Sequence, residues 1–170
     1  MTPSAGPSAG PSPSAQDPAR ASETAQWLCY VGLLPFIGLV ILSAADPQRA
    51  PAWSDALVGY GAVILSFVGA LHWGLAMGLP ALAPDLRRHA FMWSVVPALL
   101  AWPATVFGGP VACLVLVLGF ALHLGQDHRL AGPAALPAWY LPLRWRLTAV
   151  ASVCLLAEAW QGMGQPGTRG

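Results

Sequence analysis

The sequence predicts an all-α polytopic membrane bundle of about five transmembrane helices, preceded by a disordered tail. Two features of composition predict this class: 56% of the 170 residues are hydrophobic and only 9% are charged, against about 25% charged residues in an ordinary soluble domain. A soluble fold of this size could not bury so much apolar surface, whereas lipid solvates it. The third observation is that the apolar residues fall in runs close to the ~20 residues a helix needs to cross a bilayer.

Two polar tails are expected to flank the transmembrane domain, residues 27–163. Residues 1–26 are rich in Pro, Ser, Ala and Gly and show no apolar period. They cannot bury enough apolar surface to offset the entropy lost on ordering, so we expect a disordered tail. Residues 164–170 are expected to form a short C-terminal tail.

The apolar segments are expected to be helices, because membrane strands show an alternation over ~10 residues that is absent here. Pro35, Pro97 and Pro103 lie inside the segments and should bend them, since proline removes a backbone hydrogen bond. The expected spans cover residues 27–45, 56–79, 90–107, 110–126 and 146–163.

The first segment, WLCYVGLLPFIGLVILSAA, ends before Asp46 in a sequence that resembles a signal-peptidase site. Its apolar stretch is longer than the roughly 7–15 residues of a signal peptide, and only Arg20 precedes it as a basic residue. We expect an uncleaved anchor. A cleaved signal peptide is the alternative and would leave the remaining topology unchanged.

The second segment, residues 56–79, carries small residues every four positions, which would let a neighbouring helix approach closely. His72 lies nearly opposite this stripe at about 100° per residue, and a histidine facing acyl chains would be unfavourable. We therefore expect both faces of this helix to be covered by protein. The expected helix-packing residues are Gly69, Ala70, Gly74 and Gly78.

Only Gly108 and Gly109 separate the third segment from the fourth, which begins at Pro110. So short a connection predicts a tight antiparallel hairpin, and the strongly apolar VACLVLVLGFAL of the fourth segment favours two full crossings. One shallow re-entrant unit is the alternative.

The arginines predict the orientation, because short cytoplasmic loops carry an excess of basic residues. We expect a multi-pass protein of the bacterial inner membrane with a cytoplasmic N-terminus and a periplasmic C-terminus. The formal net charge of +1 indicates no nucleic-acid partner. Arg20, Arg87, Arg88, Arg129, Arg144 and Arg146 fall on the side of the N-terminal tail, and Arg49 and Arg169 on the other.

Polar side chains gather toward the cytoplasmic side of the second and fourth segments. His123 and Asp127 lie one turn apart on one helix face. Interhelical hydrogen bonding of the histidines and a solvated Asp127–Arg129 pair are the ordinary interpretation, and a functional site is the alternative. The candidate buried polar site comprises Ser66, His72, Trp73, His123, Asp127, Arg129 and Glu158.

Haem or metal binding through His72 and His123 is an alternative, with Asp127 accepting a hydrogen bond from an imidazole. We expect no cofactor, because His123 should lie closer to the membrane interface than His72 and no HxxxH or HExxH spacing occurs. Glu158 is the only carboxylate well inside a span. It can extend to the surface or pair inside the bundle, and a proton or substrate relay is a further alternative.

The connection LPAWYLPLRWRLT, residues 136–148, precedes the last span. Trp139 and Tyr140 suit the headgroup level, and Arg144 and Arg146 could face lipid phosphates. We expect an inner-leaflet lipid contact here; ordinary topology signalling by the arginines is the alternative.

The runs YGAVILSFVGALHWGLAM (60–77) and LPAWYLPLRWRLT resemble the domain of unknown function 3429 family. YVGLLPFIG (30–38) and QDHRLA (126–131) extend the resemblance over essentially the whole chain after the tail. The resemblance implies a small helical protein of the bacterial or mitochondrial inner membrane, and it implies no activity. The positions that match the family blocks are Pro35, Gly61, Ser66, Gly69, His72, Trp73, Gly74, Asp127, Arg129, Trp139, Tyr140, Arg144 and Arg146.

Three classes of function remain open. We favour a non-enzymatic membrane protein that supports assembly or binds membrane lipids, another membrane protein or a second copy of itself. The alternatives are a small proton-coupled carrier that uses His72, Asp127 and Glu158, and a haem- or metal-binding redox protein that uses His72 and His123.

Overall fold

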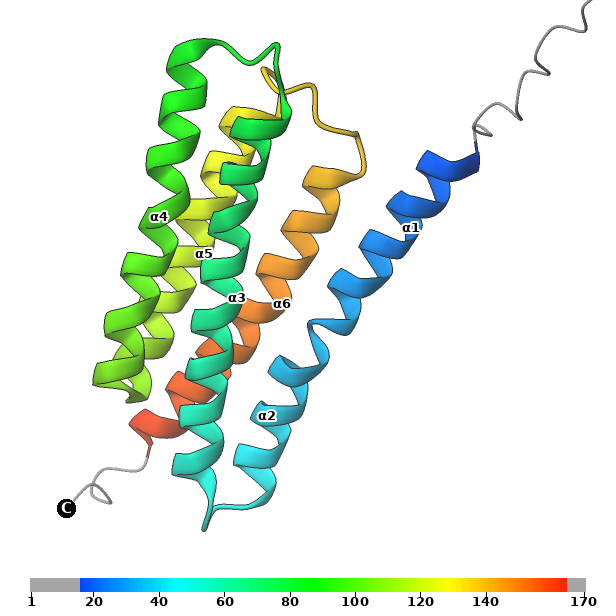
Figure 1. Ribbon diagram of the computed structural model, residues 1–170. Coiled ribbons are helices and arrows are strands. Elements are labelled where there is room, and N and C mark those ends of the chain that lie inside the picture. Colours follow the sequence, from blue (N-terminus) through cyan, green and yellow to red (C-terminus); the bar gives the residue numbers. More distant parts are fainter. Residues whose placement is uncertain (1–15, 165–170) are drawn as a thin grey trace, which may run out of the picture.

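The structure is a computed structural model that describes residues 16–164. These residues form six α-helices and no strand, which confirms the predicted all-α class. In Figure 1, α3 to α6 stand together as a bundle, α2 packs at its lower end, and α1 leans away from it. The helices are α1 (Gln16–Val31), α2 (Leu34–Ala45), α3 (Ala50–Gly78), α4 (Pro84–Phe107), α5 (Gly109–Ala131) and α6 (Tyr140–Met163).

Four stretches of the described chain are long and apolar enough to cross a membrane: Ser22–Ala45, Ala50–Gly78, Pro84–Phe107 and Gly109–Ala131. Each of them overlaps one of the first four expected spans. The fifth expected span falls on α6, whose 24 residues are long enough to cross but carry two arginines and a glutamate.

The first expected span is divided between α1 and α2, with a turn at Gly32 and Leu33. Pro35 stands in the first turn of α2, where its missing N–H has no intrahelical partner to lose. The bend expected at this proline is therefore a break between two helices. Pro97 and Pro103, in contrast, lie within the continuous helix α4.

Helix α1 begins at Gln16, ahead of the expected span and inside the expected tail. Alanine, glutamine and glutamate are good helix formers and are frequent just before Trp27, so the helix extends into the polar segment. The rest of the expected tail, residues 1–15, and residues 165–170 at the C-terminal end lie outside the described residues.

The tight hairpin between the third and fourth expected spans is present. Helix α4 ends at Phe107 and α5 begins at Gly109. Between them Gly108 has φ of 62°, a left-handed conformation that a residue with a side chain rarely adopts. Each helix is long enough for a full crossing, which favours two crossings over a re-entrant unit.

Helix α3 packs against α2, α4 and α5 through its buried face. Among the glycines of α3, Gly69 has the least room, because an added Cβ would lie 2.9 Å from the backbone oxygen of Ser94. Leu65 of α3, Leu116 of α5 and Leu155 of α6 are fully buried in the core that these helices share. Gly69 is therefore a packing residue, as expected.

The other three expected packing residues of α3 do not face the bundle, which corrects the sequence expectation. Ala70, Gly74 and Gly78 are exposed, and a Cβ added at either glycine would meet nothing within 4 Å. A four-residue repeat turns by about 400°, so the stripe drifts about 40° at each step. It begins at the buried Ala62 and has left the packed face by Ala70.

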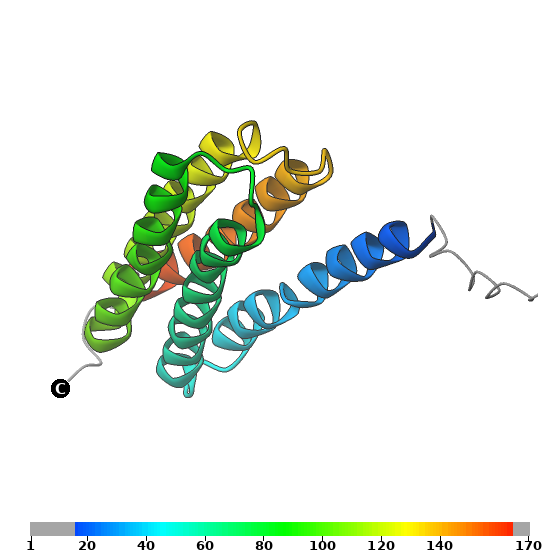
Figure 2. The same ribbon diagram turned by 45° about the horizontal axis from the view of Figure 1, so that its top comes forward.

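Both the α3–α4 and the α5–α6 connections lie at one end of the bundle, the upper end in Figure 1. We call this the arginine-rich end. Figure 2 shows that α1 also runs toward this end while diverging from α6, so that only its junction with α2 stays close to the bundle. The arginines at or near this end are Arg87, Arg88, Arg129, Arg144 and Arg146.

Candidate functional site

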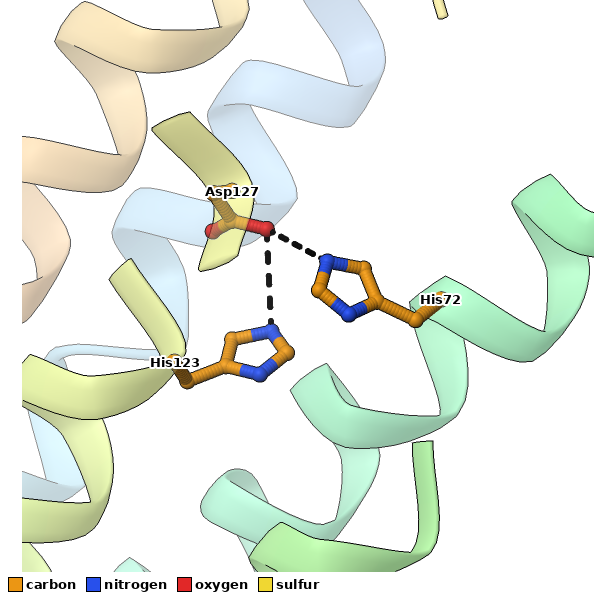
Figure 3. A group of neighbouring side chains, drawn as sticks. All are labelled: His72, His123 and Asp127. Atoms are coloured by element: carbon orange, nitrogen blue, oxygen red, sulfur yellow. Dashed lines mark hydrogen bonds and ion pairs between the residues drawn. The ribbon is translucent and has the colours of Figure 1, made fainter. Parts of the chain in front are cut away.

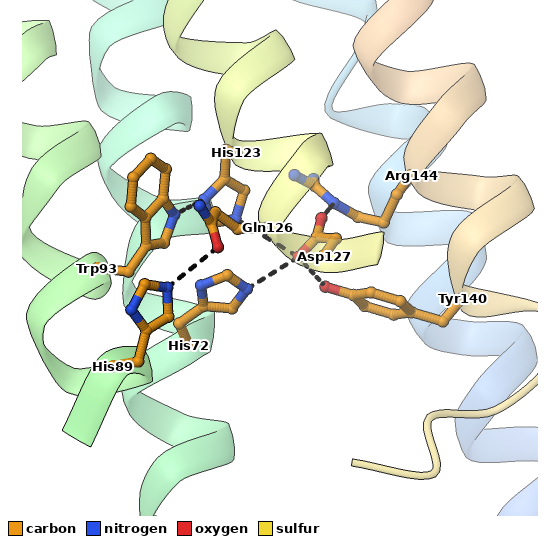
Figure 4. Close-up of polar contacts among 8 residues, drawn as sticks. All are labelled: His72, His89, Trp93, His123, Gln126, Asp127, Tyr140 and Arg144. Carbon is orange, nitrogen blue, oxygen red and sulfur yellow. Dashed lines mark hydrogen bonds and ion pairs between the residues drawn. The ribbon is translucent and has the colours of Figure 1, made fainter. Parts of the chain in front are cut away.

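A cluster of buried polar side chains lies near the arginine-rich end and joins four helices (Figure 4). His72 comes from α3, Trp93 from α4, His123 and Asp127 from α5, and Tyr140 and Arg144 from α6. We call these six residues the polar cluster. Its most deeply buried members are His72, His123, Asp127 and Arg144, with exposed fractions of 2%, 0%, 0% and 5%.

Asp127 is the centre of the polar cluster. Arg144 Nε donates to Asp127 Oδ2 at 2.6 Å, and the Tyr140 hydroxyl donates to Oδ1 at 3.1 Å. His72 Nε2 lies 3.0 Å from the same Oδ1 (Figure 3). Burying an ion is unfavourable unless it is paired and hydrogen-bonded. The Arg144 charge and these two further contacts supply that pairing.

His123 is held by a partner on another helix. The indole N–H of Trp93 donates to His123 Nδ1 at 3.1 Å, so that nitrogen acts as the acceptor. A neutral imidazole then carries its proton on Nε2. This nitrogen lies 3.7 Å from Asp127 Oδ1 and has no hydrogen-bond partner.

The two imidazoles meet, which corrects the expected difference in depth. Their ring centres lie 4.6 Å apart. The expectation placed the end of the fourth span at residue 126, whereas α5 continues to Ala131. His123 is therefore farther from the end of its helix than the apolar run alone indicated.

Arg129 is not the partner of Asp127, contrary to the expected ion pair. Residues two apart on a helix do not face each other, and Arg129 is exposed while Asp127 is fully buried. Arg129 instead borders a cavity of about 200 Å³ together with His72, His89 and other residues. His72 thus separates this cavity from Asp127.

Tyr140 and Arg144 were expected to contact lipid, but both belong to the polar cluster. They lie four residues apart and share one face of α6, which packs on α5. Arg146 is exposed and donates to the hydroxyl of Tyr30 on α1 at 3.1 Å. Trp139 is half-buried beside Tyr140.

Two further candidates lie outside the polar cluster. The Ser66 hydroxyl donates to the backbone oxygen of Ala62 in its own helix at 2.8 Å. Trp73 is 48% exposed and contacts Phe91 and Met77. Trp93, which was not among the residues predicted from the sequence, makes the contact with His123 in the polar cluster. Trp93 lies four residues after His89, so both lie on one face of α4. This face meets polar residues of α5, because His89 contacts Gln126 at 3.1 Å.

Glu158 is buried at the opposite end of the bundle, where Ser43 donates to its Oε1 at 3.0 Å. It therefore pairs inside the bundle and does not extend to the surface. The apolar core between Glu158 and the polar cluster includes Leu65, Leu116 and Leu155, and Thr148 of α6 is a buried polar residue between Arg144 and Glu158 in the sequence. A relay between Glu158 and His72 has no continuous polar path among these residues.

The donor set of the polar cluster fits a haem or a metal poorly. A haem would have to lie between the two imidazoles, whose centres are only 4.6 Å apart. Ligand atoms of His72, His123 and Asp127 do lie within 4.8 Å of one another. A metal on His123 Nε2 would move the proton to Nδ1, where the Trp93 N–H already points. Arg144 adds a positive charge beside the same carboxylate.

A groove of about 460 Å³ has Arg144 among its lining residues and is lined by α1, α2, α3, α5 and α6. Its walls are almost entirely apolar, and Tyr140, Arg144 and Thr148 are among its few polar residues. Helices α1 and α6, which diverge from each other in Figure 1, both line the groove. Typical apolar lining residues are Leu28, Phe67, Leu71, Leu143 and Leu147.

Comparison with known proteins places the chain among membrane proteins. It is 36% identical to transmembrane protein 69 of Xenopus tropicalis, over 81% of this chain and 54% of the relative. It is 29% identical to transmembrane protein 69 of Mus musculus, over 76% of this chain and 52% of the relative. The chain thus spans about half the length of these curated relatives. No solved structure matches it.

The family described as "Protein of unknown function (DUF3429)" matches residues 21–160, which include every helix from α2 to α5, all of the polar cluster and most of α6. This match covers far more than half of the chain, and the resemblance seen in the sequence is confirmed. The chain is an all-helical, multi-pass membrane protein that belongs to the DUF3429 family.

Proposed function

We propose that this protein is a non-enzymatic protein of the bacterial inner membrane that binds a membrane amphiphile in the groove between α1 and α6. The observation that carries the proposal is the groove itself. Its volume of about 460 Å³ lies within the roughly 300–1,000 Å³ of ligand sites, which are mostly apolar with a few polar groups.

The groove suits an acyl or other apolar tail for two reasons. Most of the helices that line it are long and apolar enough to cross a membrane, so we expect lipid around the groove. Its walls include exposed side chains such as Leu28 and Phe67, which favour apolar contact. The partner is therefore a lipid-like molecule, and a second copy of the chain or another membrane protein would be a different outcome of the test.

The polar end of the amphiphile belongs at the arginine-rich end. Trp139, Tyr140 and Arg144 line the groove there, and aromatic and basic residues favour the headgroup level. The excess of arginines supports a cytoplasmic position for this end and for the N-terminus, with the C-terminus in the periplasm.

The other two classes of function receive less support. A proton-coupled carrier would need a continuous polar path from His72 and Asp127 across the bundle, and Thr148 is the only hydroxyl among the buried residues of α6 between Arg144 and Glu158. A redox protein would need room for a cofactor, which Trp93 and Arg144 take up around the histidines and Asp127. The proposal requires no cofactor.

The test is native mass spectrometry of protein purified from its native host in mild detergent. We expect a bound amphiphile close to one per chain. Cys29 is exposed and lines the groove, so Cys29→Trp should fill it and release the amphiphile. Val111→Trp is the matched control at an exposed position of α5 outside the groove. Equal occupancy in both variants, or none in the wild type, would contradict the proposal.

A further inference from the structure

Two residues that line the groove each carry a buried polar atom without a hydrogen-bond partner: Nη2 of Arg144 and Oγ1 of Thr148. The exposed fractions of these two residues are 5% and 7%, and both line the groove. They are four residues apart and so share one face of α6. Buried polar groups are rarely left unpaired, because each one loses its hydrogen bonds to water.

The hydroxyl of Thr148 has no hydrogen-bond partner, unlike two other hydroxyls on helices of this protein. Ser66 donates to the backbone oxygen of Ala62, and Thr105 donates to that of Trp102. Thr148 makes no such bond. Its hydroxyl is therefore free to donate to a molecule in the groove, beside an arginine nitrogen that can only donate. The occupant must present an acceptor oxygen.

The charge balance favours an uncharged acceptor. The positive charge of Arg144 is already paired with Asp127 at 2.6 Å. A carboxylate or phosphate in the groove would add a negative charge without a further cation in contact, which is unfavourable in hydrocarbon. A carbonyl oxygen accepts hydrogen bonds from both donors and adds no charge.

Depth and shape narrow the occupant further. Thr148 lies eight residues beyond Tyr140, where α6 begins, or about 12 Å along the helix at about 1.5 Å per residue. This is below the level of Trp139 and Tyr140, so a charged headgroup would have to leave water to reach it. Aromatic side chains also line the groove, among them Phe36, Phe67 and Phe120, and they suit a flat ring.

We infer that the groove binds a quinone with a long apolar tail, and that one quinone carbonyl accepts hydrogen bonds from Arg144 Nη2 and Thr148 Oγ1. The inference rests on the proposed function, because it names the class of amphiphile for the same groove. It concerns binding alone. The tail lies along the apolar walls that α1 and α6 provide.

The test measures retention of a decyl-tailed benzoquinone by immobilised protein at constant detergent concentration, with the quinone quantified by ultraviolet absorbance. We expect saturable binding close to one quinone per chain. Thr148→Val keeps the shape and removes one hydrogen bond, so the Kd should rise about five- to tenfold. Thr105→Val makes the same chemical change at an exposed threonine outside the groove and should leave the Kd unchanged.

Decylbenzene, which has no carbonyl, should show no difference between the wild type and Thr148→Val. Equal quinone affinity in these two proteins would overturn the inference. Failure of the wild type to retain quinone, while an amphiphile is still lost in Cys29→Trp, would overturn it and leave the proposed function standing. Displacement of quinone by phosphatidylglycerol would assign the two donors to a lipid ester carbonyl. Absence of both quinone and a co-purifying amphiphile would overturn both proposals.

Discussion

Asp127 and Glu158 are two carboxyl groups buried in opposite ends of one bundle, and their surroundings differ. Asp127 accepts hydrogen bonds from Arg144 and Tyr140 and contacts His72. Glu158 accepts one hydrogen bond from Ser43, and its other oxygen has no partner. Among the described residues no basic side chain forms an ion pair with Glu158.

This contrast indicates where a buried charge is stabilised in this protein. At Asp127 of α5, two other helices, α3 and α6, contribute groups to one carboxylate, so removing a single partner leaves the others buried and unsatisfied. At Glu158, one hydrogen bond from the Ser43 hydroxyl joins α2 to α6. Stability should therefore depend strongly on the polar cluster and weakly on Glu158. Four substitutions test this contrast, each read as a free energy of unfolding in mixed micelles.

The largest effect is expected for Arg144→Met. It leaves the Asp127 carboxylate buried without its cation, and loss of one partner of a buried ion pair typically costs about 3–5 kcal/mol. Arg129→Met removes an exposed arginine near the same end and should leave the free energy of unfolding unchanged. A loss of stability that is the same for both variants would show that Asp127 does not depend on Arg144.

Tyr140→Phe should have the next largest effect. The variant keeps the ring and removes the hydroxyl that donates to Asp127 at 3.1 Å. Hydrogen bonds to charged groups contribute about 1.5–3 kcal/mol. Tyr30→Phe is the control, because the Tyr30 hydroxyl makes only an exposed contact with Arg146. An unchanged free energy of unfolding for Tyr140→Phe would place the hydroxyl outside the polar cluster.

Trp93→Phe removes the indole N–H that donates to His123 Nδ1. Both partners are neutral, so we expect a smaller loss of about 1 kcal/mol. The control is Trp145→Phe, which removes a similar contact to His128 at 2.8 Å on the exposed surface. Equal effects would mean that burial adds nothing to the Trp93 contact.

Glu158→Gln should have the smallest effect, within about 1 kcal/mol, because the amide oxygen can still accept the Ser43 hydrogen bond. Asp127→Asn makes the same change at the other end and should cost several times more, since Arg144 would lose its charged partner. Comparable losses at the two positions would contradict the contrast between the two ends.

The partners in the polar cluster could be predicted only in part. The four-residue spacing of His123 and Asp127 was enough to place both on one face of α5. The arginine that pairs with Asp127 could not be chosen the same way, because Arg129 is near in sequence but points elsewhere. Arg144 reaches Asp127 only because α6 packs on α5.

Which face of α3 packs against the bundle could also not be predicted from the sequence. Small residues at Gly69, Ala70 and Gly74 all fit close helix packing, yet only Gly69 meets a neighbouring backbone. Which side of a helix faces protein depends on its rotation against the other helices. A single sequence carries no direct record of that rotation when both sides are apolar or small.

The membrane class, the approximate position of the spans and the end of the bundle that carries the arginines could be predicted from the amino-acid sequence alone. These properties follow from the length of apolar runs and the cost of placing charge in lipid, which act along the chain. The depth of His123, the partner of Asp127, the contact made by Trp93 and the groove became known only from the tertiary structure. These depend on where each helix ends and how it is tilted and rotated, because a hydrogen bond forms only within about 3 Å.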